Sequence, residues 1–257
     1  MERIQIDRTV PSWDGHGHCV LRVWTPPGYA RETWRRYPVV YMQDGQNVFE
    51  HHASAPWHTW HANRAMERLV HEGRIEPWII VAMDHGPARF DDYSPWPEDS
   101  VGSAGGFDRW ARHLVDVVMP HVRRRWRTRP GAEWTATTGS SLGGMAALCL
   151  GWTRPAVFGR LGALSPSVMW AGGRLLREWT AHPRCWTRIY ADAGETELFD
   201  GEGLRLDYGK AARELGAHLH RLGYAPWELM VRLEPGGQHS EADWARRLPH
   251  AWAWLLG

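Results

Sequence analysis

Cysteine and lysine are both scarce in this chain of 257 residues. There are three cysteines, Cys19, Cys149 and Cys185, too few for a fold held by disulfides. Their odd number and wide spacing predict reduced thiols and a cytoplasmic protein. Lys210 is the only lysine, so arginine supplies almost all of the positive charge. The 30 basic residues nearly balance the 29 acidic ones, so the net charge indicates no nucleic-acid or anionic-membrane partner.

Long apolar runs are absent as well. The longest, residues 78–83, is far shorter than the roughly 20 residues that cross a bilayer. Residues 1–8 contain no apolar stretch of the kind found in secretory signals. The hydrophobic content of 43% excludes a disordered chain, and the length fits a single α/β domain over residues 1–257.

Short apolar runs alternate with longer helical patterns along the chain. We predict strands at 18–25, 37–43, 78–84, 133–138, 161–164, 186–191 and 228–233. We predict helices at 60–72, 107–125, 142–152, 205–222 and 241–255. This alternation predicts an α/β fold with a mostly parallel central sheet and helices on both faces. An antiparallel edge is the alternative for the first strand. In such sheets, functional residues follow the carboxyl ends of the strands.

A candidate nucleophile lies between a predicted strand and a predicted helix. Ser141 is the central residue of a Gly-x-Ser-x-Gly motif formed with Gly139 and Gly143. A serine on a sharp strand-to-helix turn has its hydroxyl exposed above the sheet, and glycines on both sides avoid clashes. The alternative is a glycine-rich turn that only closes the strand. The surrounding strand and helix favour the nucleophile.

A base and an acid are expected later in the chain, because hydrolases of this type run in the order serine, acid, histidine. His239 lies in the glycine-containing loop after the last predicted strand, whereas His250 falls inside a predicted helix, where packing explains it better. Asp192, Glu195 and Glu197 all follow the strand at 186–191. Position alone leaves the choice among these three carboxylates open.

The loop after the strand at 37–43 is a candidate oxyanion hole. It reads Asp44-Gly45-Gln46-Asn47 and would lie beside Ser141 in a sheet of this kind. A peptide N–H near Gln46, together with that of Leu142, would supply the two donors that a tetrahedral intermediate needs. The alternative is a simple Asp-Gly turn.

Four segments together resemble the putative esterase family of α/β hydrolases, which includes enterochelin (siderophore) esterases, feruloyl esterases and, more distantly, the antigen 85 mycolyltransferases. These segments are 39–49, 139–144, 163–167 and 237–244, and the resemblance runs from about Val20 to Trp254. It implies an α/β-hydrolase fold with Ser141 as nucleophile, His239 as base and Glu197 as acid. It also implies Gln46 as the second oxyanion donor. The sequence departs from the family where Gln43 replaces a usual histidine and where Ser240 replaces a usual asparagine.

Tryptophan is abundant, with 18 residues, and most fall in predicted strands and helices, where packing is the default explanation. Four occur where a substrate could meet them and are candidates for an aromatic-lined acyl or aryl pocket: Trp57, Trp60, Trp96 and Trp170. Arg89 is a candidate for binding an anionic substrate group, with a surface ion pair as the alternative.

These observations predict a serine carboxylic-ester hydrolase that works through an acyl-enzyme on siderophore-like or aryl esters. The alternatives are a feruloyl or acetyl esterase of carbohydrates, an acyltransferase, and a non-catalytic binding module. His16 with His18, and His58 with His61, have spacings that a metal can use, but no cysteine or carboxylate clusters with them. We therefore expect no metal or other cofactor. The expected partner is a small-molecule ester.

Overall fold

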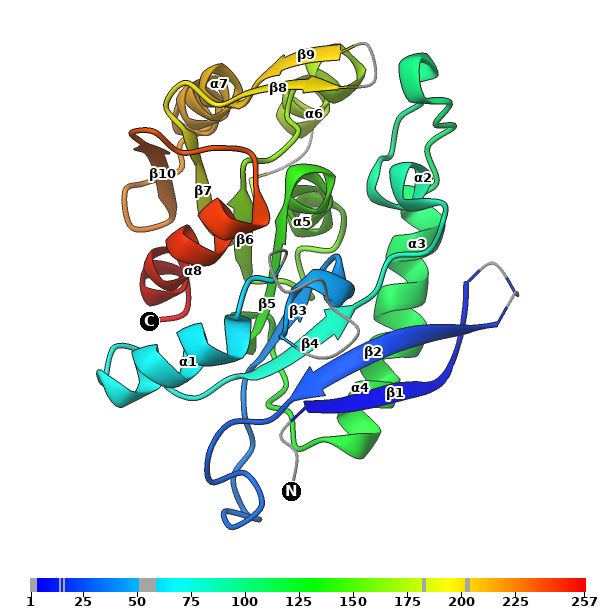
Figure 1. Cartoon of the computed structure of the whole chain (residues 1–257), viewed down its shortest axis with the longest axis vertical. Coiled ribbons are helices and arrows are strands. Elements are labelled where there is room, and N and C mark those ends of the chain that lie inside the picture. Colours follow the sequence, from blue (N-terminus) through cyan, green and yellow to red (C-terminus); the bar gives the residue numbers. More distant parts are fainter. Residues whose placement is uncertain (1–3, 14, 16, 51–58, 182–183, 202–203) are drawn as a thin grey trace.

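A mixed eight-stranded sheet forms the centre of the part of the chain that the computed structural model describes (Figure 1). The described residues are 4–13, 15, 17–50, 59–181, 184–201 and 204–257. In spatial order the strands are β1 (Ile4–Pro11), β2 (His18–Trp24), β4 (Ile79–Met83), β3 (Val39–Met42), β5 (Thr135–Ser140), β6 (Arg160–Leu164), β7 (Arg188–Gly194) and β10 (Leu229–Glu234). All the predicted strands are present, with ends shifted by a few residues.

The sheet is parallel from β4 to β10 and antiparallel at its N-terminal side. The antiparallel direction of β2 was expected as the alternative, but its edge position was wrong, because β1 pairs outside it. β1 was not predicted: only Asp7 and Val10 in it are buried, and its register shifts between these two residues, so buried and exposed positions do not alternate. A strand with so few apolar residues gives little periodic signal.

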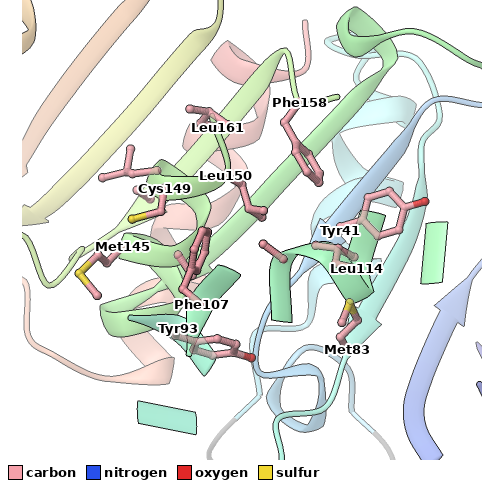
Figure 2. Close-up of a cluster of buried hydrophobic side chains, with 14 of the residues drawn as sticks. Tyr41, Met83, Tyr93, Phe107, Leu114, Met145, Cys149, Leu150, Phe158 and Leu161 are labelled. Carbon is pink, nitrogen blue, oxygen red and sulfur yellow. The ribbon is translucent and has the colours of Figure 1, made fainter. Parts of the chain in front are cut away.

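Helices cover both faces of the sheet, as the sequence predicts. Two lie on one face: α1 (Ala62–His71) and α8 (Glu241–Leu255). Five pack on the other: α3 (Phe107–His113), α4 (Met119–Arg125), α5 (Ser141–Thr153), α6 (Trp170–Thr180) and α7 (Tyr208–Arg221). Alternate residues of β3 enter the two cores, since Val40 joins the first and Tyr41 the second. Figure 2 shows part of the second core, where Tyr41 and Phe158 meet edge to face.

Two predicted helices differ from those in the structure. The helix expected at 107–125 is divided, because a π-helical turn, η3 (Leu114–Val118), joins α3 to α4. Pro120, the second residue of α4, has no N–H for the regular helical ladder. The helix expected at 205–222 begins only at Tyr208, and the residues before it form β9 (Leu204–Asp207), which pairs with β8 (Leu198–Gly201).

Short elements follow several strands at the carboxyl edge of the sheet. They are the 3-10 helix η1 (Gly45–Asn47) after β3, α2 (Arg89–Tyr93) and η2 (Asp99–Val101) after β4, and the β8–β9 hairpin after β7; a further 3-10 turn, η4 (Ala132–Trp134), precedes β5. The candidate site lies beside η1, α2 and the β8–β9 hairpin. No helix within the described ranges is long and apolar enough to cross a membrane.

Candidate active site

Ser141 occupies a strained turn between β5 and α5. Its φ is 54°, in the left-handed region that residues other than glycine rarely adopt. A Cβ on Gly139 would lie 2.5 Å from the backbone of Gly143, so close approach requires glycine at position 139, and a Cβ on Gly143 would lie 3.0 Å from the Gln43 side chain. Backbone strain held in place by such packing is common at functional sites.

Ser141, His239 and Glu197 form one hydrogen-bonded line. His239 Nε2 is 3.1 Å from Ser141 Oγ, and His239 Nδ1 is 2.7 Å from Glu197 Oε1. Because a carboxylate can only accept, Nδ1–H donates to Glu197, which leaves Nε2 free to accept the hydroxyl proton of Ser141. The structure therefore brings together the three residues that the resemblance implies as a triad.

Glu197 is fully buried yet stays anionic. Burial by itself raises the pKa of this carboxyl, but hydrogen bonds from His239, the Gly194 N–H and Ser165, with the charge of Arg247, together lower it below its ordinary value. The Gly194 N–H donates to Glu197 Oε2 at 2.6 Å and the Ser165 hydroxyl at 3.0 Å. A negative charge next to an imidazole favours its protonated form.

The loops that carry Glu197 and His239 touch through their backbones. A Cβ on Gly194 would lie 2.1 Å from the carbonyl oxygen of Gly237, and the Glu195 N–H donates to the Glu234 carbonyl at 2.9 Å. Glycine at 194 and 237 thus allows an approach that fixes the distance between the carboxylate and the imidazole.

The other two candidate carboxylates, Asp192 within β7 and Glu195 directly after it, do not contact His239. Asp192 is buried, accepts a hydrogen bond from the Tyr190 hydroxyl at 3.1 Å and lies 3.6 Å from Arg247. The Glu195 side chain is about half exposed and its nearest cation is Arg213, at 4.0 Å. Of the three candidates, Glu197 is the one that contacts His239.

The Asp44–Gly45 segment is held tightly. Arg89 donates two hydrogen bonds to the Asp44 carboxylate, at 2.7 and 2.8 Å, and the Asp44 N–H donates to the Tyr93 hydroxyl at 3.1 Å. A Cβ on Gly45 would lie 2.5 Å from the Met83 carbonyl carbon. The ion pair expected as the alternative for Arg89 is therefore present. A loop fixed in this way is suited to hold peptide N–H groups in place for an oxyanion.

Gln46 and Leu142 lie near the starts of helical segments. Gln46 is in η1, and its side-chain oxygen accepts a hydrogen bond from the His85 N–H at 3.2 Å. Leu142 directly follows Ser141 in the first turn of α5. Amides in the first turn of a helix have no partner within the helix and point outward from its end.

Two cavities share Ser141, His239 and Arg89. The larger, about 320 Å³, is mostly polar; its other lining residues are Asp44, Asn47, Trp60, His85, Ser140, Glu241 and Trp244. The smaller, about 150 Å³, is mostly apolar; its other lining residues are Phe90, Val101, Leu142, Ser167, Trp170, Phe199, Leu206 and Tyr208. The nucleophile therefore lies between a polar and an apolar compartment.

Three of the four candidate tryptophans belong to the described residues, and they lie in different places. Trp60 lines the polar cavity, and Trp170 lines the apolar one. Trp96 lines neither, since it is buried against Trp152 with ring centroids 6.2 Å apart. Its carbonyl accepts a hydrogen bond from the Trp170 indole at 3.3 Å, so Trp96 helps to hold a residue that lines the apolar cavity. Trp57 lies outside the described residues.

Tyr208 is a site residue that the sequence analysis missed. Its ring stacks on the imidazole of His239, with centroids 4.1 Å apart. Its hydroxyl lies 3.5 Å from Ser141 Oγ and 3.3 Å from Ser167 Oγ. Burial raises the pKa of this phenol, so it remains a hydroxyl at neutral pH. One signal was available: Asp207 caps α7 by accepting from the Lys210 N–H, and recognising this N-cap would have placed Tyr208 at the start of a helix.

The two departures from the family pattern are both accommodated. The buried Gln43 amide donates to Thr137 Oγ1 at 2.9 Å. Ser240 is the N-cap of α8 and accepts from the Asp243 N–H, the role that asparagine also fills well. Within the described ranges no group of three or more metal-ligand side chains occurs, and His16 and His58 lie outside those ranges.

Comparison with known proteins places the chain in a family. The family model described as "Putative esterase" matches residues 17–255. YbbA, an uncharacterized protein of Bacillus subtilis, is 20% identical over 246 residues, which cover 94% of each chain. An endo-1,4-beta-xylanase/feruloyl esterase of Xylanibacter ruminicola is 28% identical over 195 residues, which cover 74% of this chain and 24% of that protein.

Solved structures share the fold. An IroE-like serine hydrolase from Shewanella oneidensis superposes with a TM-score of 0.81 at 21% identity, covering 98% of this chain and 80% of that one. The enterobactin esterase FES from Shigella flexneri gives 0.77 at 18% identity, covering 98% and 58%. The fold is thus an α/β-hydrolase fold, and, because the family model matches nearly all of its length, the chain belongs to the putative esterase family.

Proposed function

We propose that this protein is a serine esterase in which Ser141 is the nucleophile, His239 the general base and acid, and Glu197 the residue that orients His239. The observation that carries the proposal is the line of two hydrogen bonds, 2.7 and 3.1 Å, that joins Glu197 to His239 and His239 to Ser141. Membership of an esterase family supports ester hydrolysis.

In the proposed reaction, Ser141 Oγ attacks the ester carbonyl carbon while His239 Nε2 takes the hydroxyl proton. The peptide N–H groups of Leu142 and Gln46 hold the oxyanion. His239 then gives its proton to the leaving alkoxide, and the alcohol departs, which leaves an acyl-enzyme on Ser141. Water attacks this ester while His239 removes one of its protons. His239 then returns that proton to Ser141 Oγ as the acid is released, which restores the free serine and the neutral imidazole. No cofactor takes part in these steps.

The two cavities suggest how an ester would bind. Phe90 and Trp170 stack in the apolar cavity, with centroids 6.0 Å apart and planes at 11°. An apolar cavity of about 150 Å³ is large enough for a benzene ring, so we assign the aryl or acyl part of the substrate to it. The polar cavity would take the alcohol part. The names of the relatives, an enterobactin esterase and a feruloyl esterase, favour siderophore-like or aryl esters and keep a carbohydrate-linked feruloyl ester as the second candidate.

Covalent labelling tests the nucleophile. A fluorophosphonate probe should label the wild-type protein and fail to label Ser141→Ala, because the reagent needs an activated serine. Ser140→Ala is the matched control, since Ser140 also lines the polar cavity, and it should remain labelled. Labelling that survives Ser141→Ala would overturn the assignment, and an unlabelled wild type would favour a non-catalytic binding module.

Trp170→Ala tests the assignment of the aryl group. Removing an indole that contacts an aromatic ring should raise KM for aryl acyl esters about tenfold. KM for p-nitrophenyl acetate, which has no aromatic acyl group, should stay within about twofold. Steady-state kinetics on both substrates measure the difference, and an unchanged KM for the esters with an aromatic acyl group would remove Trp170 from the substrate site.

A further inference from the structure

A buried arginine lies beside the carboxylate of the candidate triad and lines neither of the two cavities at Ser141. Arg247 belongs to α8, and its side chain is 3% exposed. Its Nη1 is 3.5 Å from Glu197 Oε2 and 3.6 Å from Asp192 Oδ1, and both carboxylates are fully buried. Burying a carboxylate is costly unless a cation and hydrogen bonds compensate it. A single guanidinium therefore compensates two buried acids.

Ser165 connects Arg247 to Glu197 through a hydrogen bond of fixed direction. Its hydroxyl oxygen accepts from Arg247 Nη2 at 2.8 Å and from the Trp244 indole N–H at 3.0 Å. Since both partners can only donate, the one hydroxyl proton of Ser165 is directed to Glu197 Oε2, 3.0 Å away. Ser165 is held in place by a left-handed backbone, with a φ of 43°, and by its N–H, which donates to the Asp192 carbonyl at 2.7 Å.

We propose that Arg247 is a positioning residue that keeps Glu197 anionic and aimed at His239, and that Asp192 competes with Glu197 for it. The proposal rests on the proposed serine-esterase function. Arg247 reaches Glu197 directly and through Ser165, so it fixes the oxygen that does not contact His239. Asp192 faces the same Nη1 from β7, so its ionisation divides the charge of Arg247 between two acids.

The other charged groups near Arg247 do not replace it as the cation beside Glu197. The other titratable groups facing a cavity of about 60 Å³ beside Asp192 and Arg247 are Tyr190, Arg232, Glu234, Arg246 and His250. Arg246 pairs with Glu234 and with Asp243 at the surface, and Arg232 pairs with Glu234. Within the described part of the chain, Arg247 is the one arginine or lysine within 4 Å of Glu197. Burial raises the pKa of Asp192 to about 6 despite Arg247, so Asp192 changes charge in the range where activity is measured.

Substitutions that remove the positive charge of Arg247 or the negative charge of Asp192 test the proposal. Arg247→Met removes the charge and keeps most of the length, so we expect kcat to fall about tenfold or more with KM nearly unchanged. The acidic limb of the pH profile of kcat/KM should move to higher pH by about half a unit or more, since losing a nearby cation favours the protonated imidazole. Arg247→Lys should restore the limb, because it restores the charge. Asp192→Asn removes an anion and should move the limb to lower pH.

The pH profiles separate positioning from a structural role. A lower kcat in Arg247→Met with an unmoved acidic limb would overturn the proposal, because loss of packing alone does not shift it. If Arg247→Met fails to fold, Asp192→Asn still tests the proposal. An acidic limb at lower pH in this variant supports the proposal, and an unmoved limb contradicts it. Fluorophosphonate labelling of the wild type tests the serine mechanism separately. A labelled wild type with unmoved limbs in all three variants would reject the role of Arg247 and leave the triad standing.

Discussion

Replacing Ser141 by alanine is expected to lower kcat about 10⁶-fold, and adding His239→Ala to that variant is expected to cost almost nothing more. The two residues are joined by one hydrogen bond, 3.1 Å from Nε2 to Oγ, and in the proposed mechanism the imidazole acts on the serine hydroxyl. Once the hydroxyl is gone, the base has no proton to take. The measurement is kcat of the two single variants and the double variant on a p-nitrophenyl ester.

The residual rate of all three variants should be similar, since it would come from binding and from the amides of Leu142 and Gln46. Ser140→Ala should keep nearly wild-type turnover and shows that a nearby change in the same turn is tolerated. If the double variant loses activity by the product of the two single losses, the two residues act independently and the proposed mechanism is wrong. A pre-steady-state burst that persists in Ser141→Ala would place the acyl group on another residue.

The sequence was most informative where a local pattern determines a local structure. Gly139 comes close to the backbone of Gly143, four residues further along the chain, so the motif around Ser141 can be recognised within a short stretch of sequence. His239 follows the last strand of the sheet, and its place in the order of the chain was sufficient to select it. The strand-and-helix alternation predicted the parallel sheet for the same reason, because buried strands are apolar along their length.

Contacts between residues far apart in the chain determine the features of the site that the sequence could not predict. Asp192, Glu195 and Glu197 all follow the strand predicted at 186–191, and which of them reaches His239 depends on the backbone contact between Gly194 and Gly237. Tyr208 is brought to His239 by the β8–β9 hairpin, whose strands are four residues each and carry little periodicity. Arg247 is one of 29 arginines by composition, and only packing of α8 against β7 makes it the cation beside two buried acids.

Replacing Glu197 by glutamine is expected to lower kcat about 10⁴-fold, the size of effect seen when a triad carboxylate becomes an amide. The amide nearly matches the carboxylate in shape but carries no charge to stabilise the imidazolium, and its NH₂ group can turn toward His239 Nδ1 and favour the wrong tautomer. The matched control is Glu195→Gln, two residues away and about half exposed, which should change kcat by less than about twofold. A larger loss in Glu195→Gln than in Glu197→Gln would reverse the assignment of the acid.

The same two variants, Glu197→Gln and Glu195→Gln, also test how the charge of Glu197 affects the stability of the fold. The pKa of Glu197 is lowered in the folded protein, so its ionisation stabilises the fold above the pKa of the unfolded chain, and that contribution is lost as pH falls through the folded value. The wild type should therefore melt above Glu197→Gln at neutral pH, and the gap should narrow as the buffer is acidified below about pH 4.5, the ordinary value for glutamate. Glu195→Gln should melt with the wild type throughout. A gap between wild type and Glu197→Gln that does not change with pH would mean that the carboxylate charge is not what the surrounding hydrogen bonds and Arg247 stabilise.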